Sequence, residues 1–520
     1  MDNQSIYPII LTILDGWGYS KTTKGNAIKL AKTPTMEKIW TNYEHCLLSA
    51  SGEDVGLPKN QMGNSEVGHT TIGAGRTINQ DLVRIQKSIE DKSFFKNPII
   101  NNICKSIENK ESKLHIIGLC SNGGVHSHIN HLKALLEIVK NYSNEVCLHI
   151  ITDGRDTEPR IANKFINSIL DDIQYNDNIN ICTISGRYYS MDRDCRWSRT
   201  EKAYKTLTEN DITGSSTDCI ELINNYYKDG ISDEFIPPTR IQSGKISDND
   251  GVLFYNFRPD RIRQLIQSLA KPKFKGFSTK NIKNLTFTTF TEYDASLKLP
   301  KVFTAEHRKN FLGQIISESN LKQLRLAETE KYAHVTYFFN GGIEEPFPGE
   351  DRELIPSPKV ETYDLKPEMS AYQITKSLLQ AIDKNIYKVI IINYANPDMI
   401  GHTGNLDATI KSIEVVDKCI NKLVDKVNKV KGTLIITADH GNADYMIDEE
   451  GKPCKSHSTN LVPFILINNN DQDIKILKKN GTLSDIAPTI LDILNIKVPS
   501  EMNGESLINR TNVHALNQLK

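Results

Sequence analysis

Residues 9–16 read IILTILDG, a mostly apolar run that ends in an aspartate and a glycine. Similar short runs recur along the chain. They alternate with stretches in which apolar residues fall near i, i+3, i+4 and i+7, as in 128–142 and 409–429. This alternation of strand-like and helix-like segments predicts an α/β fold with largely parallel sheets covered by helices. The predicted strands are 9–14, 114–119, 146–151, 180–185, 252–257, 388–393, 433–437 and 462–467.

Length and composition narrow the function classes. A chain of 520 residues predicts two to four domains. Its 63 basic and 64 acidic side chains give no overall field that would attract a polyanion, so we expect no nucleic-acid partner. Because no apolar run approaches the length of a membrane span and no basic segment precedes a signal-like run, we expect no membrane association and a cytoplasmic location.

Acidic residues and histidines follow several predicted strands. Ligands of parallel sheets bind at the carboxyl ends of the strands, so these side chains should converge at one edge. Three carboxylates and three imidazoles without a cation would hold like charges in a poorly solvated pocket. Oxygen and nitrogen ligands without thiolate suit Mn²⁺, Mg²⁺ or Zn²⁺, and six of them suit two adjacent ions. The predicted ligands are Asp15, Asp398, His402, Asp439 and His440, with His457 just before the last predicted strand.

Each part of this pattern has a simpler interpretation when it is taken alone. An aspartate after a strand is usually a turn or helix-capping residue. Asp398 and His402, spaced i, i+4, would suit a surface pair equally well. Only the combination after strands of one sheet favours a binuclear metal centre.

Ser65 is the candidate nucleophile. It lies between Gly63 and Gly68 at a predicted helix start, where backbone amides favour an anion. By itself, Asn64 or Ser65 would more simply be an N-cap. Two dications, three aspartates and neutral imidazoles leave one positive charge, which a Ser65 alkoxide would neutralise. Since metal coordination lowers the pKa of a bound oxygen acid, we predict attack on phosphorus and a phosphoserine intermediate.

The middle of the chain differs in its basic residues. The segment 155–263 holds ten arginines and five lysines, whereas lysine predominates elsewhere. The planar guanidinium grips a carboxylate or phosphate with two hydrogen bonds, which lysine cannot do. We therefore predict an anion-binding site that contains Arg155, Arg187, Arg193, Arg258 and Arg261.

Ten segments together resemble, in order and across nearly the whole chain, the cofactor-independent (2,3-bisphosphoglycerate-independent) phosphoglycerate mutases. The resemblance implies an alkaline-phosphatase-like metal domain, as in the alkaline phosphatase superfamily, with an inserted α/β substrate-binding domain. It implies interconversion of 3-phosphoglycerate and 2-phosphoglycerate in glycolysis and gluconeogenesis. The segments are ILTILDGWG, GLPKNQMGNSEVGHTTIGAGR, GGVHSH, TDGRDT, GRYYSMDRD, NFRPDRIR, EKYAHVTYFFNGG, NYANPDMIGHTG, TADHGNAD and HSTN.

The resemblance also implies the cofactors and the roles of particular residues. It implies two Mn²⁺ ions, with Mg²⁺ or Zn²⁺ as alternatives, and no requirement for 2,3-bisphosphoglycerate. One ion would be bound by Asp398, His402 and His457, and the other by Asp15, Ser65, Asp439 and His440. The expected substrate-binding residues are His126, Arg155, Asp156, Arg187, Arg193, Arg258, Arg261 and Lys331, and the expected catalytic residues are Ser65, Lys331, Asp156 and Arg258.

Two positions near the expected glycerate site depart from the family pattern. Asn122 stands where the family usually has Asp, and Cys195 where Asn is common. Both departures concern substrate affinity more than the chemistry.

Ligands near both ends of the chain must meet, so we expect one discontinuous domain. Residues 1–79 and 308–520 should form the metal-binding phosphatase-like domain, and residues 80–307 the inserted phosphotransferase or substrate domain. We expect 3-phosphoglycerate or 2-phosphoglycerate as the small-molecule partner, and a monomer.

Three other functions stay open at this point. A metal-dependent phosphatase would use the same metals and Ser65, although the arginine-rich insertion argues against it. A phosphopentomutase-like enzyme would keep the phosphoserine and act on ribose phosphates. A non-enzymatic metal-binding protein is disfavoured because every expected ligand type is present.

Overall fold

The chain divides into two compact units in the computed structural model. Unit 1 comprises Met1–Gln80 and His307–Lys520, and unit 2 comprises Asp81–Glu306. The predicted boundary at 307–308 lies outside the residues that the structure describes. The metal-binding and substrate-binding roles assigned to the two parts of the chain stay predictions. The described residues are 7–209, 218–304, 309–468, 474–476 and 480–510.

Unit 1 is built on a mixed sheet with a parallel centre. β10, β9, β11, β1 and β12 run parallel, whereas β13 is antiparallel to both of its neighbours. Every residue of β1, β11 and β12 is buried, which explains why these strands read as continuous apolar runs in the sequence. Among the described residues the strand order is β10 (Glu350–Ile355), β9 (Gln323–Glu328), β11 (Val389–Tyr394), β1 (Ile9–Leu14), β12 (Thr433–Thr437), β13 (Val462–Asn468), β2 (Glu44–Ser49) and β15 (Asn480–Thr482).

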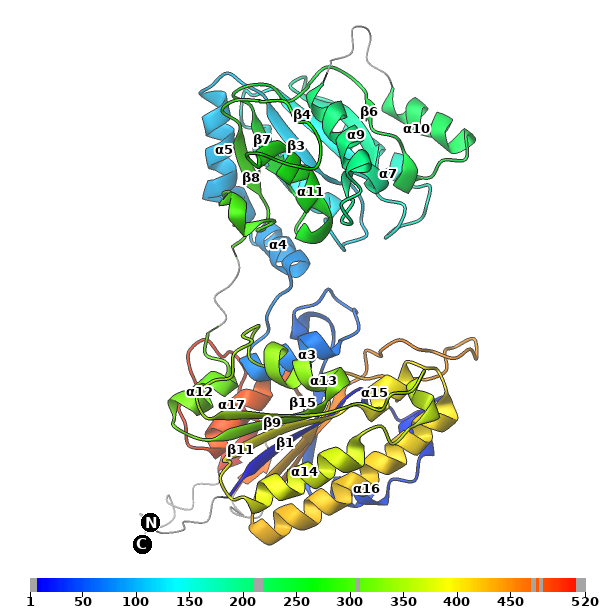
Figure 1. Ribbon diagram of the computed structural model, residues 1–520, viewed down its shortest axis with the longest axis vertical. Coiled ribbons are helices and arrows are strands. Elements are labelled where there is room, and N and C mark those ends of the chain that lie inside the picture. The colour runs from blue at the N-terminus through cyan, green and yellow to red at the C-terminus, as the bar shows by residue number, and fades with distance from the viewer. Residues whose placement is uncertain (1–6, 210–217, 305–308, 469–473, 477–479, 511–520) are drawn as a thin grey trace. The chain divides into compact units, whose positions relative to one another are not determined.

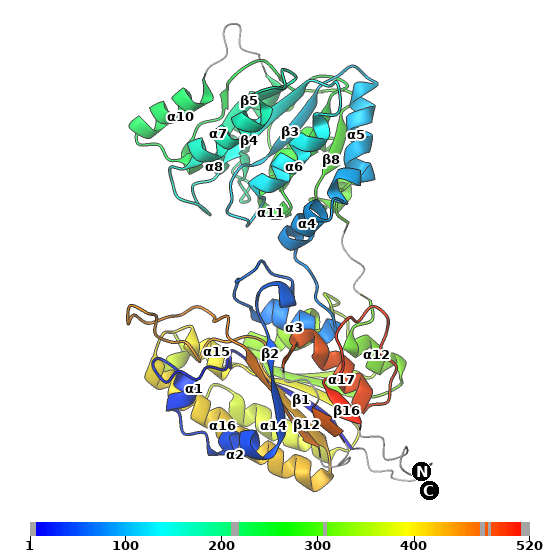
Figure 2. The ribbon, with the colours of Figure 1, turned by 180° about the vertical axis from the view of Figure 1, so that it is seen from behind.

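Helices cover both faces of the unit 1 sheet (Figure 1). α14 (Ala371–Asp383) and α16 (Leu406–Val430) lie on one face, and α3 (Ser65–Ala74) lies on the other (Figure 2). The Asn405 side chain caps α16 by accepting from the Ala408 amide. The other helices of unit 1 are α1 (Ala27–Leu30), α2 (Pro34–Asn42), α12 (Leu312–Glu318), α13 (Thr329–Ala333), α15 (Asn396–Gly401) and α17 (Ile486–Ile493).

Unit 2 is a second α/β layer structure. Its strands are parallel except for β6, which pairs antiparallel with β5. Neighbouring residues of β3 face opposite sides of the sheet, so Ile116 joins one apolar cluster and Ile117 another. The strand order is β6 (Thr239–Arg240), β5 (Ile179–Gly186), β4 (Val146–Thr152), β3 (Leu114–Leu119), β7 (Gly251–Phe254) and β8 (Thr286–Thr289). The helices are α4 (Asp81–Glu90), α5 (Pro98–Glu108), α6 (Ile129–Val139), α7 (Ala162–Ile173), α8 (Arg187–Ser190), α9 (Trp197–Thr208), α10 (Cys219–Lys228) and α11 (Pro259–Ala270).

The predicted α/β fold is confirmed, with one strand shorter than expected. The strand predicted at 252–257 ends at Phe254. Beyond it the Asn256 side chain accepts from the Leu119 amide, and the Phe257 amide donates to the His126 carbonyl. The backbone therefore leaves the sheet before the arginines that follow it.

Short elements complete the described chain. β14 (Ile474–Ile476) pairs with β16 (Ile508–Arg510). None of the helices in the described segments has the length and apolar character that a membrane crossing needs. The remaining single turns are η1 (Gly52–Val55), η2 (Phe94–Lys96), η3 (Asp233–Phe235), η4 (Ala295–Leu297), η5 (His334–Phe338), η6 (Tyr363–Leu365) and η7 (Leu483–Asp485).

Candidate metal centre and anion site

Three aspartates of unit 1 meet at the carboxyl ends of neighbouring strands. Asp15 follows β1, Asp439 lies just after β12, and Asp398 lies in α15 after β11. These strands are adjacent in the sheet, so their ends come together as the sequence predicted. All three side chains are at most 2% exposed. We call Asp15, Asp398 and Asp439 the carboxylate cluster.

Two glycines allow the backbone to approach this cluster closely. Gly16 has φ +74°, and a Cβ there would lie 2.9 Å from the Asp398 Cα. A Cβ on Gly68 would lie 2.6 Å from the Asp439 carbonyl oxygen. Larger side chains at either position would push α3 or α15 away from the cluster.

Ser65 is the first residue of α3, as the sequence predicted. The Asn64 side chain caps the helix by accepting from the Val67 amide. Ser65 Oγ lies 2.7 Å from Lys331 Nζ and donates to Asp15 Oδ1 at 3.2 Å. It also lies 3.0 Å from His440 Nε2. The hydroxyl therefore lies at the centre of the polar cluster.

The electrostatics of the carboxylate cluster favour additional cations. Lys331 Nζ lies 2.7 Å from both Asp15 and Asp398, and their charges raise its pKa against the effect of burial. Burial and the neighbouring Asp439 charge nevertheless raise the pKa of Asp15 to about 7. Asp439 Oδ2 is also buried, and the nitrogens near it belong to imidazoles, His69 Nδ1 at 3.2 Å and His440 Nε2 at 3.5 Å. One lysine thus leaves buried negative charge uncompensated, and the donor set fits bound metal ions.

The histidines complete two groups that could each hold an ion. Asp398, His440 and His457 form one group and Asp15, Asp439 and His440 the other, with ligand atoms within 4.8 Å of one another in each. His402 Nε2 lies 3.2 Å from Asp398 Oδ1. Burial lowers the pKa of His440 to about 4, so its imidazole is neutral at pH 7, the form that binds metals.

Backbone carbonyls orient two of these rings. His457 Nδ1 lies 2.7 Å from the Gly63 carbonyl oxygen, and His402 Nδ1 lies 2.8 Å from that of Lys455. In both rings Nε2 therefore faces Asp398, as expected of imidazoles that are fixed as ligands.

Sequence reasoning missed three buried residues that support the cluster. His69 Nδ1 lies 3.2 Å from Asp439 Oδ2, and the Asn393 amide donates to Asp15 Oδ2 at 2.7 Å. The Asn442 amide donates to Asp398 Oδ1 at 3.0 Å. His69 could have been found, because it lies four residues after Ser65 and therefore on the same helix face.

The structure also brings the predicted anion-binding residues of unit 2 together. We call Arg155, Arg187, Arg193, Arg258 and Arg261 the arginine cluster. Burial, and then the charges of Arg193, Arg155 and Arg187, lower the pKa of Arg261, so these side chains lie within electrostatic reach of one another. Arg187 is buried, and its Nη1 lies 2.6 Å from Asp153 and 2.5 Å from Asp156.

Asp260 links three members of this site, and the sequence did not single it out. Its carboxylate lies 3.0 Å from Arg258 Nε, 3.3 Å from Arg193 Nη1 and 3.6 Å from His126 Nδ1. Burial and the charge of Arg187 lower the pKa of His126 to about 4, so His126 is neutral at pH 7. Asp153 plays a similar part by holding Arg187 and accepting from the Ser121 hydroxyl.

The predicted site residues therefore lie in or beside one of the two clusters, although the roles assigned to them stay predictions. The comparisons first define the class of protein. The model of the Metalloenzyme superfamily matches residues 7–498, so the fold and the cluster of metal-type ligands are those of a metalloenzyme.

Comparison with individual proteins then gives the family. The chain is 67% identical to the 2,3-bisphosphoglycerate-independent phosphoglycerate mutase of Antithamnion sp., over 98% of this chain and 100% of that protein. It is 64% identical to the same enzyme of Gracilaria tenuistipitata var. liui, over 96% and 98%. A crystal structure of Leishmania mexicana phosphoglycerate mutase at low cobalt concentration is 28% identical, with a TM-score of 0.61 over 98% and 99% of the two chains. The chain therefore belongs to the 2,3-bisphosphoglycerate-independent phosphoglycerate mutases, and it is an isomerase, as the sequence predicted.

Proposed function

We propose that this isomerase interconverts 3-phosphoglycerate and 2-phosphoglycerate, a step of glycolysis, by passing the phosphoryl group through Ser65. Residues of unit 1 would handle the phosphoryl group and residues of unit 2 the glycerate. The observation that carries the proposal is the position of Ser65 Oγ, between 2.7 and 3.2 Å from Lys331, His440 and Asp15. A hydroxyl that contacts an ammonium, an imidazole and a carboxylate in a buried site is suited to act as a nucleophile.

We further propose that two divalent cations belong to this centre, Mn²⁺ first, with Mg²⁺ or Zn²⁺ as alternatives. The two ligand groups of unit 1 and the three buried carboxylates, which only one lysine contacts, support it. The related Leishmania enzyme, crystallised at low cobalt concentration, is consistent with a divalent ion. When bound, such ions lower the pKa of a coordinated oxygen and stabilise charge on a phosphoryl group.

The residues of unit 1 would carry out phosphoryl transfer as follows. Ser65 Oγ forms the bond to phosphorus while the bond from phosphorus to the glycerate oxygen breaks, and the serine proton ends on that oxygen. Lys331 donates to Ser65 Oγ, which favours its deprotonated form, and its charge then opposes that of the phosphoryl oxygens. The start of α3 favours the phosphoserine that forms there.

The residues of unit 2 would hold the glycerate between the two transfers. The arginine cluster offers forked donors for the carboxylate, with Arg258 at the N-cap of α11 and Arg261 in its first turn. Asp156 and Arg155 would bind a hydroxyl of the glycerate, and Asp156 would accept and return the proton of that hydroxyl. The second hydroxyl then takes the phosphoryl group from Ser65, which regenerates the free serine.

Four finer properties belong to the same proposal. No added 2,3-bisphosphoglycerate should be needed, because the substrate itself supplies the phosphoryl group. We also propose that the protein is a cytoplasmic monomer that binds no nucleic acid, as its balanced charge suggests.

The test follows 3-phosphoglycerate by ³¹P NMR in the presence of Mn²⁺ and without 2,3-bisphosphoglycerate. We expect 2-phosphoglycerate to appear, and acid-quenched enzyme to carry phosphate on Ser65 in peptide mass spectra. Release of free phosphate without 2-phosphoglycerate would instead indicate a phosphatase. Turnover of ribose phosphates alone would indicate a phosphopentomutase-like enzyme.

A further inference from the structure

Asp444 is a buried carboxylate of unit 1 to which the proposed reaction gives no role. It ends the segment TADHGNAD (437–444), which follows β12, and it is 2% exposed. Two donors from the segment that carries His457 reach its Oδ2. The Ser458 hydroxyl donates to it at 2.8 Å, and the Asn460 amide donates at 2.6 Å. Asp444 therefore links the segment after β12 to the segment before β13.

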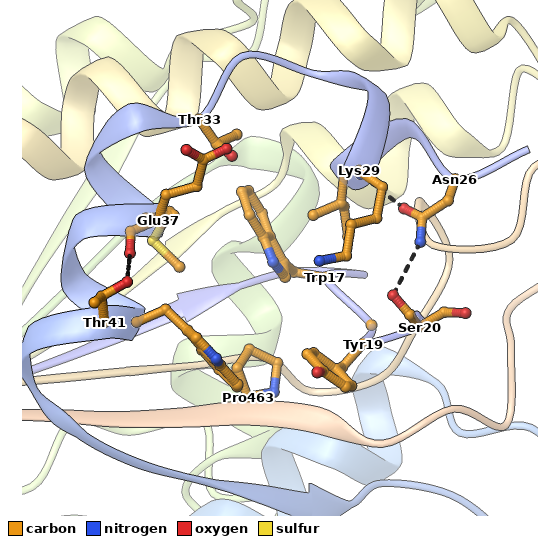
Figure 3. A pocket seen from close by; sticks show the side chains of 13 residues that line it. Trp17, Tyr19, Ser20, Asn26, Lys29, Thr33, Glu37, Thr41 and Pro463 are labelled. Atoms are coloured by element: carbon orange, nitrogen blue, oxygen red, sulfur yellow. Dashed lines mark hydrogen bonds between the residues drawn. The ribbon is translucent and has the colours of Figure 1, made fainter. Parts of the chain in front are cut away.

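Asp444 also packs against the backbone of the segment after β1. A Cβ on Gly18 would overlap Asp444 Oδ1, so the carboxylate lies directly against this glycine. Gly18 stands between Trp17 and Tyr19, whose side chains line a cavity of about 410 Å³ (Figure 3). Trp17 is buried, and the Tyr19 amide donates to the Leu461 carbonyl at 2.7 Å. The backbone against which Asp444 packs is therefore itself fixed by its neighbours.

His457 is the predicted metal ligand that most needs such support. Asp15 and Asp439 lie at the ends of strands, whereas His457 lies in the loop before β13. Its Nε2 lies 3.2 Å from Asp398 Oδ1, and its ring stacks on that of His440 with centroids 3.9 Å apart. A shift of this loop would move His457 Nε2 away from the ligand group that it forms with Asp398 and His440.

We propose that Asp444 is a positioning residue for His457 and thereby sets the affinity of the metal ion that His457 would help to bind. This inference rests on the metal centre proposed above. One carboxylate oxygen can accept from two donors, so a single side chain fixes both Ser458 and Asn460. Replacing residues that orient a metal ligand in this way commonly weakens metal binding by about 10- to 100-fold.

The test measures Mn²⁺ binding to metal-free protein by electron paramagnetic resonance of the free ion. We expect wild-type protein to bind two ions, and Asp444→Ala to raise one of the two Kd values by about 10-fold while the other stays unchanged. Asp444→Asn keeps an oxygen that can accept from Ser458 and Asn460, so its Kd values should be closer to those of wild type. Wild-type Kd values in Asp444→Ala would overturn the proposal.

Asp417→Ala is the matched control for the loss of a buried carboxylate. Asp417 is also 2% exposed, but it accepts from the Thr35 and Met36 amides and so caps α2. This variant should lower the urea midpoint of the metal-free protein and leave both Kd values unchanged. If Asp417→Ala weakened Mn²⁺ binding as much as Asp444→Ala does, the effect would be a general loss of stability, and the positioning role would be refuted.

A milder variant tests the route through the loop. Ser458→Ala removes one donor to Asp444 and should raise the same Kd by a smaller factor than Asp444→Ala does. Adding Ser458→Ala to Asp444→Ala should change that Kd no further, because the hydrogen bond is already lost. Fully additive effects would show that Asp444 does not act through Ser458 and would count against the proposal. Wild-type protein that binds no Mn²⁺ would instead overturn the metal centre itself.

Discussion

The carboxylate cluster of unit 1 and the arginine cluster of unit 2 differ in charge and in exposure. The three aspartates are at most 2% exposed, with Lys331 as the basic side chain in direct contact with Asp15 and Asp398. In contrast, the side chains of Arg155, Arg193 and Arg258 are about half exposed, at 53%, 49% and 49%.

The difference shows what each cluster is suited to bind. Burying uncompensated carboxylates costs free energy whether or not substrate is bound. We therefore expect the carboxylate cluster to hold cations that remain bound throughout turnover. The half-exposed guanidinium groups of Arg155, Arg193 and Arg258 can be hydrated when no anion is present, so we expect the arginine cluster to bind and release an anion reversibly. The predictions below test this contrast.

Replacing Ser65 should have the largest effect. Ser65→Ala removes the oxygen that we propose as the nucleophile, and we expect mutase activity to fall by about 10⁴-fold or more. Binding of 3-phosphoglycerate by the arginine cluster should persist. Coupled enzyme assays and calorimetry measure the two properties, and Ser500→Ala, at an exposed position of unit 1, is the control. Activity within tenfold of wild type would exclude a serine nucleophile.

Removal of metal should separate the two clusters. Exhaustive chelation should lower activity by about 10³-fold, because several kcal/mol of phosphoryl-charge stabilisation are lost, and added Mn²⁺ should restore it. The arginine cluster contains no metal-type ligand group among the described residues, so titrations with D-glycerate should be unchanged. Full turnover of metal-free protein, checked by elemental analysis, would contradict the proposed centre.

A conservative change in the arginine cluster should have a smaller effect. Arg187→Lys keeps the charge but replaces the planar guanidinium whose Nη1 contacts both Asp153 and Asp156, and we expect kcat/KM to fall by about 100-fold. Metal content should not change. Arg196→Lys, at an exposed ion pair with Asp194, is the matched control and should behave as wild type. An equal loss in both variants would show that the effect is not specific to the site.

Asp260 should act by positioning its neighbours. Asp260→Asn removes the charge that holds Arg258 and Arg193, and we expect KM for 3-phosphoglycerate to rise about 10-fold with little change in kcat. Asp171→Asn, on the exposed side of α7, is the control. A fall in kcat with unchanged KM would mean that Asp260 takes part in the reaction itself.

The sequence predicted the carboxylate cluster because its signal is local. Asp15 directly follows an apolar run, and Asp398 and Asp439 lie a few residues after two others. In parallel sheets such positions share one edge, whatever the strand order. The order itself, in which β1 lies between β11 and β12, could not be read from the sequence because it depends on which distant segments pair.

The partners of the arginines were not predictable in the same way. Composition singled out Arg187 and Arg258, but nothing in the sequence links them to Asp153 and Asp260 in preference to other aspartates. These contacts depend on side-chain geometry at the ends of β4 and β7. The end of β7 could not be predicted for the same reason. The strand ends where Asn256 and Phe257 form hydrogen bonds with residues that are distant in the sequence.

Two buried imidazoles, His440 of unit 1 and His131 of unit 2, differ in their contacts, and this difference gives the smallest effect on activity. In unit 1 His440 contacts carboxylates, whereas His131 of unit 2 is fully buried and neither of its ring nitrogens has a partner among the described residues. Burial and the nearby His128 lower the pKa of His131 to about 3. Its ring lies near those of Phe257 and Phe290, with centroids 5.8 and 6.3 Å away.

Acid should therefore destabilise unit 2 through His131. Below about pH 6.5 the unfolded chain binds a proton at this residue that the folded protein does not, so the free energy of unfolding falls as the pH drops from 6.5 towards 3. At pH 5 the loss should be about 2 kcal/mol, that is, 1.5 pH units at about 1.4 kcal/mol each. His131→Phe should reduce the acid sensitivity of unit 2 by about this amount and leave mutase activity unchanged. Burial also lowers the pKa values of His149 and His126, which account for acid sensitivity that remains. Pulse proteolysis in urea at pH 7.5 and pH 5 measures this change in the free energy of unfolding, with unit 1 peptides as the internal reference. The same loss in the variant would show that other groups cause the acid sensitivity of unit 2.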